Sequence, residues 1–222
     1  MPGLSIIQKL AIWALPILFA VTLHEVSHGW VARFFGDHTA ERMGRLSLNP
    51  LRHIDPVGTI LVPAVMLLLT GFVFGWAKPV PVVASNMRNP RKDMAIVALA
   101  GPLTNLVMAI IWAAVLKLCL VVGPSGYLTL PLGLMARAGV FINLVLMVLN
   151  LIPVPPLDGS RVLNGLLPES WARVVDRVEP YGLLILILLL MTSALNTILY
   201  PPLIFFARLV FGLFGLSGMG GV

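Results

Sequence analysis

The sequence contains little cysteine and few charged residues. It has one cysteine, Cys119, among 222 residues, and only 11 % of its residues are charged. A single cysteine excludes an intrachain disulfide and a metal site built from cysteine ligands. With 59 % hydrophobic residues and a mean hydropathy of +0.98, the chain is too apolar for a soluble domain and for a disordered protein. The composition predicts a helical membrane protein with several spans.

Acidic residues are also scarce, with 9 Asp and Glu against 15 Lys and Arg. In a soluble protein this excess would suggest a nucleic-acid partner. Here we expect none, because Lys and Arg commonly flank membrane spans on the cytoplasmic side. Basic residues gather in stretches 33–55, 75–93 and 159–180, whereas stretch 123–131 has no charge. We therefore expect a multi-pass protein of the cell (plasma) membrane with the three basic stretches in the cytoplasm.

The chain contains a series of long apolar runs. A helix needs about 20 apolar residues to cross the hydrocarbon core of a bilayer. The runs are 4–35, 57–74, 94–122, 132–152, 181–199 and 203–216. They predict an all-α fold with five to six transmembrane segments in a single domain of residues 1–222, with a catalytic core at about 5–165 and C-terminal helices at about 180–217. The charge pattern requires run 57–74 to return to its starting side as a re-entrant hairpin, although a plain spanning helix is equally compatible with its length.

Three polar residues interrupt the first apolar run. His24, Glu25 and His28 form the pattern H-E-V-S-H. On a helix, positions i and i+4 lie on one face, so both imidazoles can bind one tetrahedral metal ion and Glu25 can reach its water ligand. Ionisable groups are costly in a membrane, and packing alone would not select three of them. The pattern therefore predicts a catalytic metal site, with a non-catalytic metal site or a proton path as the alternative.

Two histidines leave a protein ligand to be found, and Asp158 is the best candidate. It follows a proline-rich stretch, N-L-I-P-V-P-P-L-D-G at residues 150–159, which cannot continue the preceding helix. A helix broken inside a membrane must face protein or a polar cavity. The alternative is an exposed turn in which Asp158 caps a helix. His38 and His53 lie in polar loops, where ordinary surface histidines are expected.

The two motifs, on separate spans and in this order, resemble those of the site-2 protease family of intramembrane zinc metalloproteases. H-E-V-S-H is similar to the first family signature, and residues 150–159 are similar to the second. G-P-L-T-N at 101–105 resembles a third family element, and stretches 44–50 and 75–81 resemble the compact prokaryotic branch. The resemblance covers about residues 15–165. It leaves no room for a PDZ domain or a C-terminal regulatory domain, so gating by such modules is not expected.

The resemblance implies a hydrolase that acts in regulated intramembrane proteolysis. His24, His28 and Asp158 would bind zinc, and Glu25 would be the general base that activates a zinc-bound water. The substrates would be transmembrane proteins or peptides, cleaved within or near their membrane helices, at an active site toward the cytoplasmic side of the bilayer. Asn105 is a candidate catalytic residue that donates to the oxyanion. A hydrogen bond that packs two helices is an equally good interpretation of Asn105.

A short β-like segment is expected near the active site at residues 75–82. Pro79 and Pro81 favour an extended backbone there, and the segment shows no helical periodicity. It could pair with an unwound substrate as an added strand. The pairing would be partial because proline has no N–H to donate. An ordinary loop is the alternative.

Two other functions are compatible with a membrane site of this kind. A metal-ion transporter would distribute His and Asp over several spans as a path, whereas here the candidate ligands form one group beside a glutamate. An inactive relative that binds membrane helices would be expected to lack part of the site. His24, Glu25, His28 and Asp158 are all present, which favours the protease.

Overall fold

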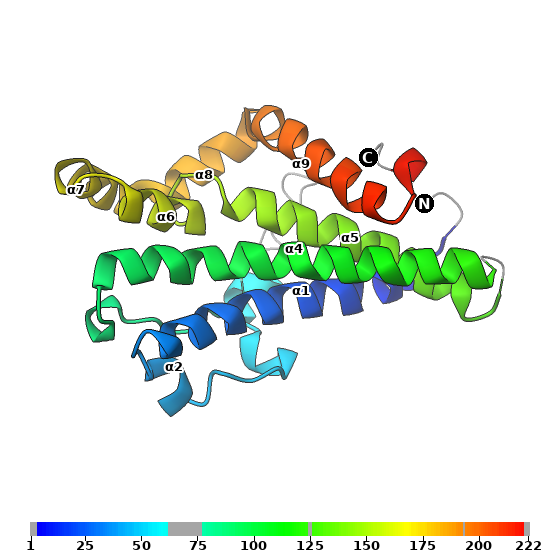
Figure 1. Cartoon of the computed structure of the whole chain (residues 1–222), viewed down its shortest axis with the longest axis horizontal. Helices are drawn as coiled ribbons and strands as arrows, with labels where there is room; N and C mark the ends of the chain where they lie inside the picture. Colours follow the sequence, from blue (N-terminus) through cyan, green and yellow to red (C-terminus); the bar gives the residue numbers. More distant parts are fainter. Residues whose placement is uncertain (1–3, 62–76, 124–125, 193, 220–222) are drawn as a thin grey trace.

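The computed structural model describes residues 4–61, 77–123, 126–192 and 194–219. Within these ranges the chain is helical and contains no strand, which confirms the all-α class (Figure 1). The α-helices are α1 (Ile6–Phe34), α2 (Thr39–Arg42), α4 (Pro90–Val122), α5 (Thr129–Asn150), α6 (Asp158–Leu166), α7 (Glu169–Val178), α8 (Gly182–Met191) and α9 (Ala194–Leu213). Short 3-10 or π turns are η1 (Pro50–His53), η2 (Pro56–Leu61), η3 (Ala84–Asn86), η4 (Glu179–Tyr181) and η5 (Ser217–Met219).

Four helices in the described part of the chain are long and apolar enough to cross a membrane. They are α1, α4, α5 and α9, with 29, 33, 22 and 20 residues. The first three coincide with the apolar runs 4–35, 94–122 and 132–152. The protein is therefore a multi-pass helical membrane protein, as its composition predicts. Run 57–74 lies mostly outside the described residues, so the choice between a hairpin and a span stays open.

The prediction of five to six spans is not confirmed, because run 181–199 does not form one helix. α8 ends at Met191 after 10 residues, about half the length needed to cross the bilayer. Thr192 then adopts an extended backbone with φ −100° and ψ 107°. α9 begins at Ala194 and continues through Pro201 and Pro202, where the sequence suggested a break. Prolines are tolerated in membrane helices when neighbouring groups satisfy the freed backbone, so they do not mark this boundary.

The centre of the molecule is a close packing of α1, α4 and α5, which run side by side (Figure 1). Small residues on the facing sides of α4 and α5 let the backbones approach. Ala109, Ala113 and Ala136 are completely buried in this contact. α9 lies across α5 and buries Val210 and Phe211 against the same core. This rigid group of helices supports the polar residues described below.

The start of α4 is tied to the end of α6. The guanidinium of Arg91 donates to the backbone carbonyl of Asn164 at 2.9 and 2.6 Å, and also to that of Leu167. The chain between α5 and α6 carries three prolines at 153, 155 and 156, and none of its residues is helical. The bend and the arginine contact together bring the first residue of α6 back toward α1 and α4.

Asp37, just beyond α1, anchors the segment that leads from the undescribed stretch to α4. Its carboxylate accepts hydrogen bonds from the Val83 N–H at 2.7 Å, the Thr39 N–H at 3.1 Å and the Asn86 side chain at 2.9 Å. Burial alone would raise the pKa of the Asp37 carboxyl, but the bonds from Asn86, Thr39 and Val83 lower this pKa below its ordinary value. Asp37 is therefore ionised at neutral pH and holds residues near 83 against the end of α1.

Candidate metal centre

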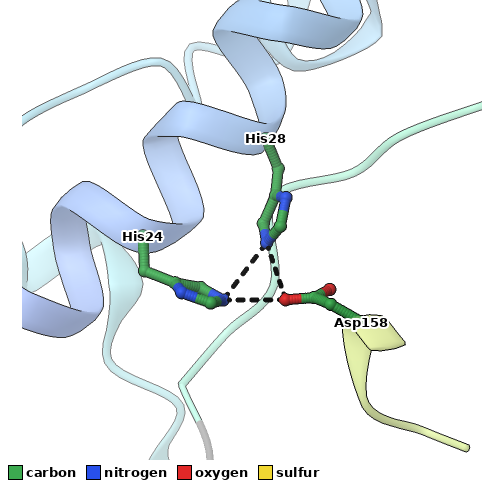
Figure 2. A group of neighbouring side chains, drawn as sticks. All are labelled: His24, His28 and Asp158. Atoms are coloured by element: carbon green, nitrogen blue, oxygen red, sulfur yellow. Dashed lines mark hydrogen bonds and ion pairs between the residues drawn. The ribbon is translucent and has the colours of Figure 1, made fainter. Parts of the chain in front are cut away.

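α1 presents His24 and His28 from consecutive turns toward the same point. Their ring centroids are 4.8 Å apart, and their Nε2 atoms are separated by 3.2 Å. Both residues are buried, with 7 % and 9 % of their surface exposed. Figure 2 shows the two rings converging from one face of the helix. The i, i+4 spacing in the sequence thus places both rings as expected from helical geometry.

Asp158 lies opposite α1, with its carboxylate directed at the two histidines. It is the first residue of α6, and the extended backbone of Leu157 precedes it. Its Oδ2 atom lies 3.2 Å from Nε2 of His24 and 3.3 Å from Nε2 of His28 (Figure 2). The three candidate ligand atoms all lie within 4.8 Å of one another. The fold therefore brings together residues that are more than a hundred positions apart in the sequence. They offer two nitrogen atoms and one oxygen atom as candidate ligands.

The hydrogen bonds around this group fit a metal ion. Nδ1 of His24 contacts Oδ1 of Asn105, and Nδ1 of His28 contacts the carbonyl of Val97, each at 2.7 Å. Because both partners are acceptors, we assign the ring protons to Nδ1, which leaves a lone pair on each Nε2. Oδ2 of Asp158 is buried and accepts no hydrogen bond in the described structure. Two imidazoles and a carboxylate with outer partners of this kind are a usual zinc ligand set.

Gly101 allows both rings to lie against the backbone of α4. A Cβ atom at this position would be 2.5 Å from Cε1 of His24 and 2.5 Å from Nε2 of His28. Such distances are far below normal contact, so a larger residue would force the rings to move. From the sequence, Gly101 is part of the G-P-L-T-N element, and close approach of two helices is the only role that a lone glycine in a span suggests. A glycine within a helical span was the available signal.

Asn105 is completely buried and links three helices. Its Oδ1 atom accepts from Nδ1 of His24. Its amide nitrogen donates to the Ala20 carbonyl at 3.2 Å and to Oδ1 of Asn143 at 3.0 Å. Both amide hydrogens of Asn105 are thus donated to neighbouring helices. This is the arrangement expected if Asn105 packs helices together by hydrogen bonds. Asn143, which donates to the Gly139 carbonyl at 2.8 Å, was missed by sequence analysis. An asparagine within apolar run 132–152 was the signal that could have identified it.

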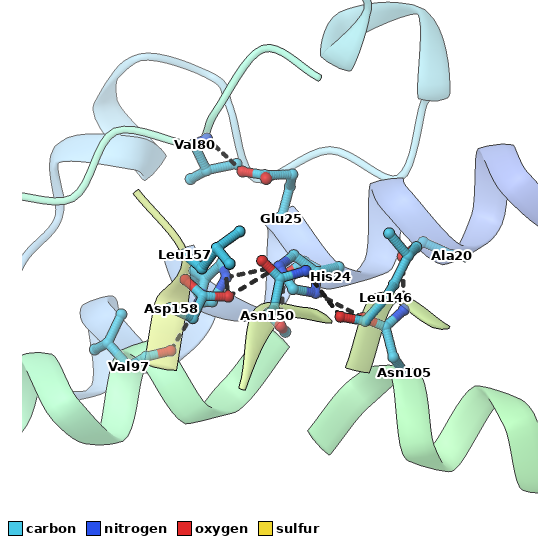
Figure 3. A network of polar contacts seen from close by, with 12 residues as sticks. Ala20, His24, Glu25, Val80, Val97, Asn105, Leu146, Asn150, Leu157 and Asp158 are labelled. Atoms are coloured by element: carbon cyan, nitrogen blue, oxygen red, sulfur yellow. Dashed lines mark hydrogen bonds and ion pairs between the residues drawn. The ribbon is translucent and has the colours of Figure 1, made fainter. Parts of the chain in front are cut away.

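Glu25 is directed toward the segment that precedes η3. Its Oε2 atom accepts a hydrogen bond from the backbone N–H of Val80 at 2.9 Å (Figure 3). Residues 77–83 form neither helix nor strand, while 75 and 76 lie outside the described residues. The expected β-like segment is therefore not seen as a strand, and its pairing with a substrate stays a prediction. Asn150 turns back onto its own helix and donates to the Leu146 carbonyl at 2.9 Å.

The other two histidines do not join the group of candidate ligands. His38 is on the surface, with Nδ1 2.8 Å from Oε2 of Glu41. His53 was expected to be an ordinary surface histidine, but it is only 3 % exposed, and its Nε2 donates to the Ser47 carbonyl at 2.8 Å. The expectation was wrong because the loops around η1 fold onto each other. Among the described residues, His24, His28 and Asp158 are the only set placed to share a metal ion.

Comparisons with known proteins found one family model and several curated relatives that match most of the chain. The family model described as Peptidase family M50 matches residues 12–126 and 128–193. The protein named "Putative zinc metalloprotease YwhC", from Bacillus subtilis (strain 168), is 38 % identical over 189 residues, which are 84 % of this chain and 83 % of the relative. "Putative zinc metalloprotease Rip2" from Mycolicibacterium smegmatis is 32 % identical over 206 residues, 91 % of this chain and 72 % of the relative. No solved structure matches the chain.

Proposed function

Because the chain belongs to peptidase family M50, the site-2 protease family, and is therefore a zinc metalloprotease, we propose that it cleaves its substrates inside the membrane. The peptide bonds would lie within or near transmembrane helices of other membrane proteins. The observation that carries this proposal is the buried convergence of His24, His28 and Asp158 beside a membrane-spanning helix. A hydrolytic centre at that depth has access to bonds that a soluble protease cannot reach.

In this proposal His24, His28 and Asp158 hold the zinc ion. The contacts of each Nδ1 atom, with Asn105 and with the Val97 carbonyl, fix the ring tautomers and point Nε2 at the metal position. Asp158 supplies the one negative charge among the three ligands. When bound, zinc supplies Lewis-acid chemistry, which polarises a carbonyl group and makes water more acidic.

Glu25 is proposed as the general base. It follows His24 on α1, and the residue is partly exposed rather than sealed in the core. A carboxylate oxygen of Glu25 would take a proton from the attacking water and then pass it to the leaving amine of the substrate. The N–H of Val80 donates to Oε2 and so helps to hold the Glu25 carboxylate in place.

We propose that Asn105 positions His24 rather than stabilising an oxyanion, because its two amide hydrogens are already donated. Asn105→Ala should lower the affinity for zinc by about 10–100-fold, as is typical when the outer partner of a metal-binding histidine is lost. Cleavage should recover when zinc is added in excess. Titration with a competing zinc chelator would measure the affinity. If Asn105→Ala reduced cleavage while zinc affinity stayed normal, a direct role in the reaction would be indicated instead.

The proposed location is the cell membrane, with the active site toward the cytoplasm. In Figure 1, α2, α6, α7 and the start of α4 lie at one end of the molecule, and the end of α4 and the start of α5 lie at the other. The elements at the first end belong to the basic stretches 33–55, 75–93 and 159–180, whereas the two helix ends opposite them flank the uncharged stretch 123–131. The positive-inside rule puts the basic end in the cytoplasm. The second half of α1, which carries His24 and His28, is nearer to that end.

Cleavage of a defined membrane peptide tests the function. Zinc-loaded protein in lipid vesicles should cut a fluorogenic transmembrane peptide, and a chelator should stop the reaction until zinc is restored. Glu25→Gln should lower the rate by about 10²–10⁴-fold, the usual contribution of a general base, while zinc content stays the same. Glu169→Gln, an exposed glutamate on α7, serves as the matched control. Equal cleavage by Glu25→Gln and the wild type, or zinc flux without peptide cleavage, would contradict the proposal.

A further inference from the structure

A single arginine binds three carbonyls from two other backbone segments, one of which contacts Glu25. The guanidinium of Arg45 donates to the carbonyl of Arg52 at 2.7 Å, of Lys78 at 2.9 Å and of Pro79 at 3.2 Å. The last two carbonyls belong to the segment that approaches Glu25. Arginine suits this task because its planar group presents several donors in a fixed geometry.

One peptide group connects Arg45 with Glu25. The Pro79 carbonyl that accepts from Arg45 and the Val80 N–H that donates to Glu25 belong to the same planar unit. A cation at the oxygen end strengthens the donor at the nitrogen end, because hydrogen bonds in series polarise one another. Arg45 therefore affects both the position of this N–H and the strength of its bond to the carboxylate.

Packing fixes the same peptide group from the side of α1. Val80 is only 6 % exposed, and a Cβ atom on Gly29 would lie 2.9 Å from its Cγ1 atom. The Lys78 N–H also donates to the His53 carbonyl at 2.9 Å. The segment thus lies directly on the helix that carries Glu25, and Arg45 holds its outer side.

We propose that Arg45 is a positioning residue for peptide hydrolysis, acting through the Pro79–Val80 peptide group to orient Glu25. In the described part of the chain, the Arg45 guanidinium donates to these backbone carbonyls and not to His24, His28 or Asp158. This inference rests on the proposed function, in which Glu25 is the base. The bond from Val80 to Oε2 restricts the orientation of the Glu25 carboxylate.

Steady-state kinetics with the transmembrane peptide separate positioning from simple loss of structure. Arg45→Gln should lower kcat by about 10–100-fold, less than the loss of the base itself, with little change in KM and with unchanged zinc content. Arg45→Lys should recover part of kcat, because lysine restores the charge without the planar group. Arg42→Gln is the matched control, since Arg42 is an exposed arginine three residues away. An unchanged kcat, a rise in kcat, or a fall that follows loss of zinc would overturn the proposal.

Hydrogen exchange gives a second measurement that does not depend on cleavage. Pro79 and Pro81 have no N–H, so the Val80 amide is the only exchangeable amide in residues 79–81. It should exchange faster in both Arg45→Gln and Glu25→Ala than in the wild type or Arg42→Gln. If the wild type cut no peptide, the proposed function would fail, whereas exchange would still decide whether Arg45 holds this peptide group. Equal protection of Val80 in Arg45→Gln and the wild type would overturn the inference.

Discussion

Asp158→Asn is expected to remove both zinc and proteolysis. The substitution keeps the size of the side chain but replaces the only anionic member of the proposed ligand set with a neutral amide, which is a poor donor to zinc. The buried Oδ2 atom now lies 3.2 and 3.3 Å from the two Nε2 atoms, and no other described acid joins the group. Cleavage should fall to the level of chelator-treated wild type, a larger loss than the two to four orders of magnitude expected for Glu25→Gln.

Zinc content and cleavage should be measured on the same preparation. Elemental analysis of purified Asp158→Asn should find substoichiometric zinc, whereas the wild type should hold one ion per chain. Asp176→Asn is the matched control, because Asp176 is an exposed aspartate on the neighbouring helix α7. Its zinc content and cleavage should stay at wild-type values. If Asp158→Asn kept its zinc and cut the peptide normally, the third ligand would have to be another residue.

Sequence alone predicts the parts of this fold that depend on local pattern. Long apolar runs identify α1, α4 and α5 because a membrane requires continuous helices of about 20 residues. The spacing of His24 and His28 places both rings on one face because the helix repeat requires it. The prolines before Asp158 predict a break after α5, and the chain bends there.

The remaining features depend on contacts between segments that are distant in the sequence. α8 ends before Thr192 rather than at the prolines, and nothing in the uniformly apolar pattern of this run marks that boundary. Asn143 is recognisable as unusual, but its bond to Asn105 requires α5 to lie beside α4. The three acceptors of Arg45 come from loops whose approach no local pattern indicates. Sequence thus identified candidate ligands more readily than the residues that hold them in place.

A larger side chain at position 101 should disrupt the metal centre without removing any ligand. The Cβ atom of Gly101→Ala would lie 2.5 Å from both His24 Cε1 and His28 Nε2. Neither imidazole ring can move away from this Cβ atom without breaking a contact, because each Nδ1 atom makes a hydrogen bond of 2.7 Å. A displacement of about 1 Å at a catalytic centre can cost about 100-fold in rate, so Gly101→Ala should lose at least that much cleavage. Gly101→Val should be inactive and should lack zinc.

Gly212→Ala is a matched control for this prediction. Gly212 is also a helical glycine, in α9, and a Cβ atom there would meet no atom within 4 Å. The same chemical change should therefore leave zinc content, cleavage and thermal stability close to the wild-type values. Thermal melting of Gly101→Ala in detergent, compared with that of zinc-free wild type, separates local displacement of the rings from failure to fold. If Gly101→Ala bound zinc normally and cleaved the peptide at the wild-type rate, α4 would have to lie farther from the two histidines than the structure places it.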